Sequence, residues 1–508
     1  MNLTRRTVLH SLALTTAATL MENATLTRNA FAAPPDDSVL HDHDRPSFHL
    51  LPARGWMNDP CAPAYHRGQY HMFHQYNPHA AVWGDMHWAH ATSPDMVHWT
   101  RQPVALAPTP NSSDAQGCFT GSSLLLNGQP AIIYTGVQSV LLAEATLADG
   151  HNNFRETQNL ALATDATLRT WTKRPQPVIP TPPPGLHVTG FRDPTPFRIA
   201  NTQYLLVGSG IAGQGGMVLL YRATTPDLTH WEYLHPLLQG QWSGTPGNNP
   251  VDTGEMWECP DFFPLGPSGQ YVLIYSTQGK TLWHSGTLDP ATLRFHPLKS
   301  GELDYGHGTF YAPKTQLDAH GNRILWGWLP ETRPEAEYAR AGWSGLMSLP
   351  RRLTLVNGDL HMEPAAETRL LRAHPNPTPN RLSSSAQEFS CVLQAAASSS
   401  PTPYTLYDSI GPLLEIRSDP AQAPRTLRLN DLHIDIPEPL SPQAGFHLFA
   451  DNSVLELFVD SRFCFTRRFY RAGTLARDPA QPVATLTLPG TCRIVRPQSF
   501  AVNSVWSS

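Results

Sequence analysis

Residues 91–99 read ATSPDMVHW and residues 223–231 read ATTPDLTHW, so one turn sequence occurs twice in the chain. Weaker copies read ATDATLRTW at 163–171 and GTLDPATLRF at 286–295. Each copy follows a strand-like run, turns around its aspartate and ends on an aromatic residue. The closing aromatics lie at 99, 171, 231 and 295, and a fifth unit fits at about 310–355. The repeat predicts a five-bladed β-propeller with long loops.

The rest of the composition agrees with an all-β protein. The 508 residues include 49 Pro and 35 Gly, which favour short strands joined by rigid turns. Short alternating strands recur from residue 403 onward, as is typical of a β-sandwich. We therefore expect a five-bladed β-propeller at 33–355, followed by a C-terminal β-sandwich at 403–508. Between them, residues 356–402 are expected to form a linker or edge segment, because 373–402 are rich in Pro, Ser, Ala and Asn.

The N-terminus has the three parts of an export signal. Arg5 and Arg6 form a twin-arginine pattern, residues 12–21 are modestly apolar, and Ala30-Phe31-Ala32 fits a cleavage site. We expect residues 1–32 to direct the protein to the periplasm or the extracellular medium. No apolar run reaches the ~18 residues of a membrane helix, so membrane insertion is not expected. The net charge of -5 argues against a nucleic-acid partner.

The six cysteines predict neither a metal site nor a cofactor. They show no CxxC pair and no metal-ligand spacing. Cys391 and Cys492 could pair after export, and the sequence leaves that question open.

Three acidic motifs occupy nearly the same place in three repeat units. Asp59 lies 40 residues before Trp99, Asp193 lies 38 before Trp231, and Glu258 lies 37 before Phe295. Equivalent positions in a propeller are related by rotation about its axis, so the three acids should converge on one cavity. Such a cluster suits glycoside cleavage, in which one carboxylate attacks the sugar and one carboxylic acid protonates the leaving oxygen. The third can hold sugar hydroxyls and stabilise the transition state.

Several tryptophans could provide flat faces for sugar rings in such a cavity. The candidates are Trp56, Trp83, Trp88, Trp257 and Trp343. Taken singly, each tryptophan is more often a core residue than a sugar-binding one.

A set of motifs that spans nearly the whole mature chain resembles one family. The motifs are WMNDPC (56–61), HQYNP (74–78), WGDMHWAHATSPDMVHW (83–99), FTGS (119–122), FRDPTPF (191–197), WECPD (257–261), GWSGLMSLPRRL (342–353) and DNSVLELFVD (451–460). Together they resemble glycoside hydrolase family 32, the β-fructofuranosidases, inulinases and levanases. The resemblance implies a five-bladed propeller, a β-sandwich and a retaining mechanism through a fructosyl-enzyme intermediate.

The resemblance also implies roles for individual residues. It makes Asp59 the nucleophile, Glu258 the general acid/base and Asp193 the transition-state stabiliser. The positions that it places in the substrate pocket are Asn58, Gln75, Trp83, Phe119, Ser122, Arg192, Asp304 and Tyr311. One departure is Cys61-Ala62, which follows Asn-Asp-Pro where many members have Asn-Gly.

The function expected from these features is a secreted retaining hydrolase that releases terminal β-D-fructose from sucrose or from fructans such as levan and inulin. A fructosyltransferase would share the three acids, and a catalytically idle fructan-binding propeller is an alternative of another class. A related family of arabinan- and xylan-cleaving propellers fits the motifs less well. The sequence leaves open the preferred linkage and exo versus endo cleavage. The sandwich could bind polysaccharide, form a homodimer or brace the propeller.

Overall fold

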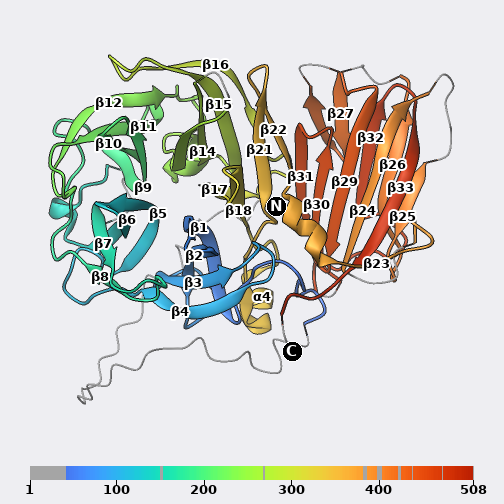
Figure 1. The fold of residues 1–508 in the computed structure, drawn as a ribbon, viewed down its shortest axis with the longest axis horizontal. Helices are drawn as coiled ribbons and strands as arrows, with labels where there is room; N and C mark the ends of the chain where they lie inside the picture. The colour runs from blue at the N-terminus through green and yellow to red at the C-terminus, as the bar shows by residue number, and fades with distance from the viewer. Residues whose placement is uncertain are drawn as a thin grey trace.

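Two β-rich units lie side by side in the computed structural model (Figure 1). The structure describes residues 42–148, 153–266, 269–381, 386–396, 403–421, 425–436, 439–471 and 473–506, so the predicted export signal lies outside the described residues. One unit is a ring of five sheets and the other is a pair of packed sheets. The predicted fold class, a five-bladed propeller followed by a sandwich, is confirmed.

Each blade is a sheet of four main strands that run outward from the propeller axis. The first two blades contain β1 (Gly55–His66), β2 (Gln69–Asn77), β3 (His87–Ser93) and β4 (Thr100–Leu106), then β5 (Gly117–Leu126), β6 (Gln129–Ser139), β7 (Phe154–Ala163) and β8 (Trp171–Lys173). The next two contain β9 (Val188–Ile199), β10 (Thr202–Ile211), β11 (Gly215–Ala223) and β12 (Trp231–Gln239), then β13 (Glu258–Pro264), β14 (Gln270–Thr277), β15 (Lys280–Leu288) and β16 (Phe295–Glu302). The fifth contains β17 (Tyr311–Leu317), β18 (Arg323–Leu329), β21 (Arg351–Val356) and β22 (Asp359–Pro364), with β20 (Leu346–Met347) beside β18.

The ring of blades closes through a short parallel strand. β19 (Trp343–Ser344) follows the fifth blade's second strand and pairs with β1, the innermost strand of the first blade. The innermost strands β1, β5, β9, β13 and β17 contact one another in a closed circle. Closure of this kind leaves no open sheet edge at the axis, so side chains that point inward are held at fixed positions.

The repeated turn joins the third and fourth strands of four blades, and its chemistry explains the repeat. Asp95 accepts a hydrogen bond from the backbone N–H two residues later at 3.1 Å. Asp165, Asp227 and Asp289 do the same at 2.7, 3.4 and 2.8 Å. Each turn also holds one buried apolar residue at a positive φ; these are Met96, Leu168, Leu228 and Leu293. The aspartate therefore stabilises a left-handed turn that inserts an apolar side chain between blades.

Every innermost strand contains a β-bulge at the same level of the axis. Two of its residues lie opposite a single residue of the second strand, at 58–59, 119–120, 193–194, 259–260 and 312–313. Bulges redirect side chains, here toward the axis. Asp59 is the second residue of its bulge, Asp193 is the first, and Glu258 directly precedes its bulge. The three acids thus occupy adjacent register positions rather than one identical position.

The sandwich packs a six-stranded sheet against a five-stranded sheet. The first has the order β23 (Arg372–Pro375), β33 (Cys492–Val502), β24 (Ala386–Ala395), β29 (Gln443–Asp451), β30 (Val454–Val459) and β31 (Phe463–Arg468). The second has the order β25 (Tyr404–Tyr407), β26 (Pro412–Asp419), β32 (Ala484–Pro489), β27 (Thr426–Leu429) and β28 (Leu432–Asp435). Phe389, Leu414, Leu457 and Leu486 are among the apolar side chains buried between them.

The linker expected at 356–402 is not what the structure shows. β22 completes the fifth blade, and β23 and β24 belong to the six-stranded sheet. The reason is the alternation of buried apolar side chains at Phe389, Cys391 and Leu393, which pack into the sandwich core although their surroundings are rich in Ser, Ala and Pro.

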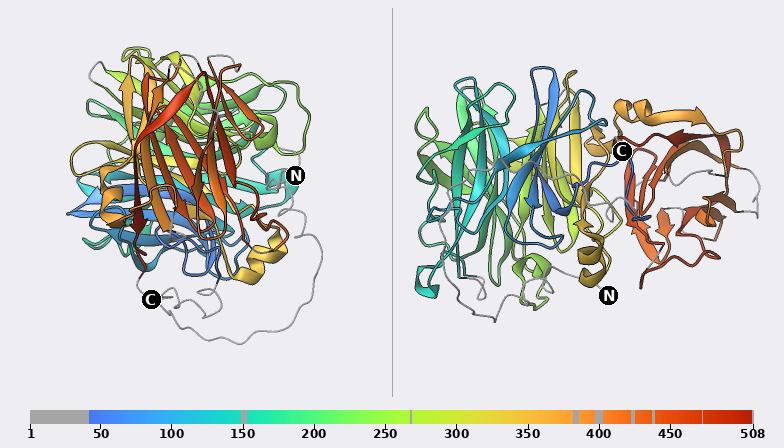
Figure 2. Two further views of the ribbon diagram at one scale, coloured as in Figure 1. Left: turned by 90° about the vertical axis from the view of Figure 1, so that its right-hand side faces the viewer. Right: turned by 90° about the horizontal axis from the view of Figure 1, so that it is seen from below.

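The propeller and the sandwich pack against each other (Figure 2). Buried ion pairs join them at this boundary. The Arg351 guanidinium donates to Glu456 of β30 at 2.6 Å and to Asp304 at 2.9 Å. His49 lies between Asp451 at 2.7 Å and Glu456 at 3.0 Å. Burial alone would lower the pKa of His49, but the hydrogen bonds to Asp451 and Glu456 raise it to about 9. Glu456 is therefore the shared counter-charge of two buried cations.

We expect Glu456→Gln to destabilise the protein by about 3–5 kcal/mol, because Arg351 and His49 would keep their charge without a buried carboxylate between them. Urea unfolding followed by tryptophan fluorescence measures the change. Glu363→Gln is the control, because Glu363 pairs with Arg352 at the surface and surface pairs contribute about 0–1 kcal/mol. Equal losses in the two variants would contradict this account of the interface.

Candidate active site

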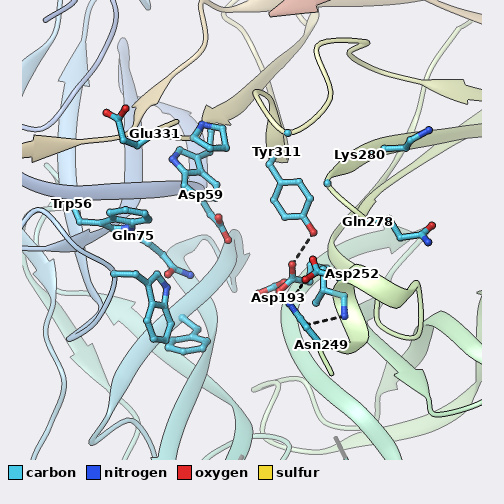
Figure 3. Close-up of a pocket in the computed structure, with 18 of the residues that line it drawn as sticks. Trp56, Asp59, Gln75, Asp193, Asn249, Asp252, Gln278, Lys280, Tyr311 and Glu331 are labelled. Carbon is cyan, nitrogen blue, oxygen red and sulfur yellow. Dashed lines mark hydrogen bonds between the residues drawn. The ribbon is translucent and has the colours of Figure 1, made fainter. Parts of the chain in front are cut away.

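A cavity of about 800 Å³ opens at one end of the propeller axis. Asp59, Asp193 and Glu258 reach it from β1, β9 and β13, so the structure brings the three predicted acids together. Figure 3 shows the Asp59 side chain and the Tyr311 hydroxyl entering the cavity from different walls. Two short helices, α3 (Pro250–Thr253) and α4 (Glu335–Ala341), supply part of the outer lining.

The Asp59 carboxylate is held in one orientation by neighbours on three strands. Thr120 donates its hydroxyl to Oδ2 at 2.6 Å, and Asn58 donates its amide to Oδ1 at 3.1 Å. Asn58 also donates to Gln75 at 3.0 Å and accepts from the indole of Trp56 at 2.9 Å. Since Asp59 is only 3% exposed, this network rather than solvent fixes its direction.

The Glu258 carboxylate has different partners. Arg192 donates from Nε to Oε1 at 3.0 Å, and the Tyr311 hydroxyl donates to Oε2 at 2.8 Å. Arg192 is itself anchored by Glu156 of β7 at 3.0 Å. Although burial opposes it, the flanking carboxylates of Glu156 and Glu258 raise the pKa of Arg192, so this side chain keeps its positive charge.

Asp193 lies between the other two acids in a strained backbone position. Its φ of 65° is in the left-handed region, and its N–H donates to Thr135 Oγ1 at 2.9 Å. The backbone N–H of Cys259 donates to Asp193 Oδ2 at 2.8 Å. Burial and the nearby Glu258 carboxylate raise the pKa of Asp193 to about 7. The cluster therefore retains a proton up to neutral pH, because carboxylates this close cannot all ionise freely.

Lys314 of β17 is a buried positive charge beneath the acids that the sequence analysis missed. It is 1% exposed, and its Nζ donates to Thr195 Oγ1 at 2.5 Å and to the Pro260 carbonyl at 2.9 Å. Burial raises the pKa of Asp193 and of the Cys259 thiol, and the positive charge of Lys314 opposes part of that rise. The one available signal was a lysine within the apolar strand YAPKTQL.

Most of the predicted substrate-binding residues surround this cavity. Those that line it are Gln75, Trp83, Phe119, Arg192 and Tyr311. Asn58 lies directly behind Asp59 and is fully buried. Of the candidate tryptophans, Trp56 and Trp83 line the cavity, whereas Trp88, Trp257 and Trp343 are buried in the cores between blades.

Two predicted pocket residues lie elsewhere. Ser122 lies 3.2 Å from Thr195 Oγ1 and lines a second cavity of about 450 Å³, formed by the later residues of the innermost strands at the other end of the axis. Asp304 accepts from Arg351 and from the Thr466 hydroxyl and N–H, at the buried boundary with the sandwich. Ser122 comes too late on its strand to reach the acids, and Asp304 is already fully hydrogen-bonded.

Other lining residues had no sequence signal. They include Glu156, Asn249, Asp252, Gln278, Lys280, His307, Trp328, Glu331, Arg333 and Tyr338. They come from loops and strand ends of several blades, and only the closed ring brings them to one cavity.

The structure also shows where the potential metal ligands and the thiols lie. In the part of the chain that the structure describes, the one group able to hold a metal ion is His79, Asp85 and His87, which does not line the cavity. All six cysteines are free thiols, including Cys391 and Cys492. Burial raises the pKa of Cys61 and Cys259, which makes both poor nucleophiles. Among the described residues, no helix is long and apolar enough to cross a membrane.

Comparison with known proteins places the chain in a family of glycosidases. Residues 49–364 match the model of the glycosyl hydrolases family 32 N-terminal domain. The sucrose-6-phosphate hydrolase of Escherichia coli is 35% identical over 458 residues, covering 84% of this chain and 89% of that protein. The raffinose invertase of Escherichia coli is 36% identical over 352 residues, covering 66% and 68%. The chain belongs to glycoside hydrolase family 32 and is a glycosidase.

A solved structure supports the same assignment. Fructan 1-exohydrolase IIa from Cichorium intybus superposes with a TM-score of 0.71 at 26% identity, covering 91% of this chain and 98% of that one. The likeness therefore includes the sandwich as well as the propeller.

We expect the pH profile of kcat/KM to fall on its basic side near pH 7, where Asp193 and the acid cluster lose their proton. Lys314→Met should move this limb to higher pH, by roughly half a unit to one unit, because removing a positive charge disfavours ionised Asp193. Lys299→Met is the control, because Lys299 pairs with Asp359 at the surface. A limb that stays in place, or moves to lower pH, would contradict the role given to Lys314.

Proposed function

We propose that this enzyme releases terminal β-D-fructose from sucrose and fructans, with Asp59 as nucleophile, Glu258 as general acid/base and Asp193 as transition-state stabiliser. One observation carries the proposal: Asp59 and Glu258 enter one cavity from different blades and have different hydrogen-bonding partners. Two carboxyl groups with distinct surroundings are what a retaining glycosidase needs.

In the first step, an Asp59 oxygen attacks the anomeric carbon of the fructosyl residue. The bond from that carbon to the leaving oxygen breaks, and the leaving oxygen takes the proton delivered by Glu258. The product of this step is a fructosyl ester on Asp59. Arg192 and Tyr311 hold Glu258 from two sides, which keeps its carboxyl group directed at the leaving oxygen.

In the second step, the Glu258 carboxylate takes a proton from a water molecule. The water oxygen attacks the anomeric carbon, and the bond to Asp59 breaks, so fructose leaves with its original configuration. Asp193 accepts hydrogen bonds from fructose hydroxyls in both transition states, where positive charge develops on the ring. Repulsion between Asp193 and Glu258 favours the retention of one proton by the pair up to neutral pH, and in the first step that proton has to lie on Glu258.

Asp59→Ala and Glu258→Ala should each lower kcat by at least about 1,000-fold, because each removes a group that acts on the reacting bond. Azide should partly rescue the second step of Glu258→Ala by forming a fructosyl azide, since a small anion can replace water without needing a base. Asp165→Asn, at an exposed turn of the second blade, is the control and should retain full activity. Near-native turnover in Asp59→Ala would make the assignment wrong.

The names of the relatives and the volume of the cavity support substrates of two or more sugar units. The relatives named above are a sucrose-6-phosphate hydrolase, a raffinose invertase and a fructan exohydrolase. A cavity of about 800 Å³ holds more than one sugar unit. The twin-arginine pattern at Arg5 and Arg6 supports export, where polymeric fructans are the accessible substrates.

Incubation with sucrose, levan and inulin in parallel, with products resolved by size, tests this function. We expect free fructose from at least one of the three, because the proposed mechanism transfers a terminal fructosyl residue to water. New trisaccharides at high sucrose would indicate a fructosyltransferase, and short oligosaccharides without fructose would indicate endo cleavage. No product from any of the three would contradict the proposal.

A further inference from the structure

The charged lining of the active-site cavity is strongly acidic. Among the described residues, seven carboxylates line it: Asp59, Glu156, Asp193, Asp252, Glu258, Glu331 and Glu335. The basic residues that line it are Arg192, Lys280, Arg333 and one histidine, His307. A negatively charged ligand would therefore enter a cavity in which carboxylates outnumber cations.

Two of these cations are held between pairs of carboxylates. Arg192 contacts Glu156 and Glu258, each at 3.0 Å. Arg333 contacts Glu331 at 2.9 Å and Asp42 at 3.1 Å, and it is 5% exposed. Neither guanidinium could turn toward a ligand without leaving a buried carboxylate without its counter-charge.

The other two basic groups share one carboxylate behind the cavity wall. Glu302, at the end of β16, contacts Lys280 Nζ at 2.7 Å and His307 Nε2 at 3.0 Å. Burial would raise the pKa of Glu302, but the hydrogen bonds from His307 and Lys280 hold it below its usual value. Glu302 is therefore ionised at neutral pH and pairs with the two most exposed basic side chains of the wall.

Uncharged polar side chains complete the same region. Asn249, Gln278, Thr309 and Thr332 line the cavity. Figure 3 shows Gln278 and Lys280 together on the wall that faces Trp56 and Gln75. Amides and hydroxyls donate to and accept from sugar hydroxyls equally well, so this wall suits a neutral polyol.

We propose that the substrates are uncharged sugars and that Glu302 excludes phosphorylated ones by occupying Lys280 and His307. The inference rests on the proposed function and defines its substrate class. A phosphate monoester carries a charge of about -1.5 to -2 at pH 7 and needs Arg or Lys donors that are not already paired. The cavity offers none among its described residues, although a relative at 35% identity is a sucrose-6-phosphate hydrolase.

The test compares kcat/KM for sucrose and for sucrose 6-phosphate in the wild type and in Glu302→Gln. The wild type should prefer sucrose by on the order of 100-fold, because like charges oppose entry of the phosphate. Glu302→Gln should raise kcat/KM for sucrose 6-phosphate by about 10-fold, with less than about a two-fold change for sucrose, because it frees Lys280 and His307. Glu232→Gln is the matched control, since Glu232 pairs with Arg222 on the outer face of the third blade.

The outcomes separate the inference from the function on which it rests. Equal or better use of sucrose 6-phosphate by the wild type would overturn the inference and leave a fructosidase in place. A strong preference for sucrose that Glu302→Gln leaves unchanged would overturn the role of Glu302. Loss of hydrolysis for both substrates in the wild type would instead count against the proposed function.

Discussion

Mutual repulsion among three buried carboxylates is the constraint around which this enzyme is organised. Asp59, Asp193 and Glu258 are each 2–3% exposed, so solvent cannot screen them. Arg192 contacts Glu258 directly, and the charge of Lys314 acts on Asp193 from below. A proton retained in the cluster relieves the remaining repulsion. In the proposed mechanism, the same balance of charge lets one carboxyl group act as an acid and another as a nucleophile.

Such a cluster needs a rigid support, which the closed ring provides. The bulges of the five innermost strands lie at one level and direct side chains toward the axis. β19 closes the circle against β1. Arg351, His49 and Glu456 then join the propeller to the sandwich through buried ion pairs. We infer that the sandwich braces the fifth blade, whose strand β17 carries both Tyr311 and Lys314.

Charge also bears on which sugars the proposed site can accept. The acids at the axis serve the reaction at the fructosyl carbon, and they bias the whole cavity against anions. An enzyme of this fold that binds a phosphorylated sugar would need Arg or Lys side chains in its cavity that are not already paired with carboxylates. Here Glu302 pairs with Lys280 and His307. Neutral amides and hydroxyls also line this cavity. If the proposal holds, catalysis and substrate class are set by different residues of one cavity.

The sequence by itself determined the five-bladed fold and the convergence of the three acids. The turns that mark the blades depend only on neighbouring residues, and the acids lie at a nearly constant distance before three of those turns. An aspartate that caps its own turn, as Asp95 does, leaves a repeat that can be read along the chain. Only the tertiary structure decided which groups surround the acids. Glu156 meets Arg192 across 36 residues, Lys314 meets Thr195 across 119, and Asp304 meets Thr466 across 162. Contacts between blades, and between the propeller and the sandwich, depend on the assembled fold and no local pattern records them, which is why Ser122 and Asp304 were misplaced.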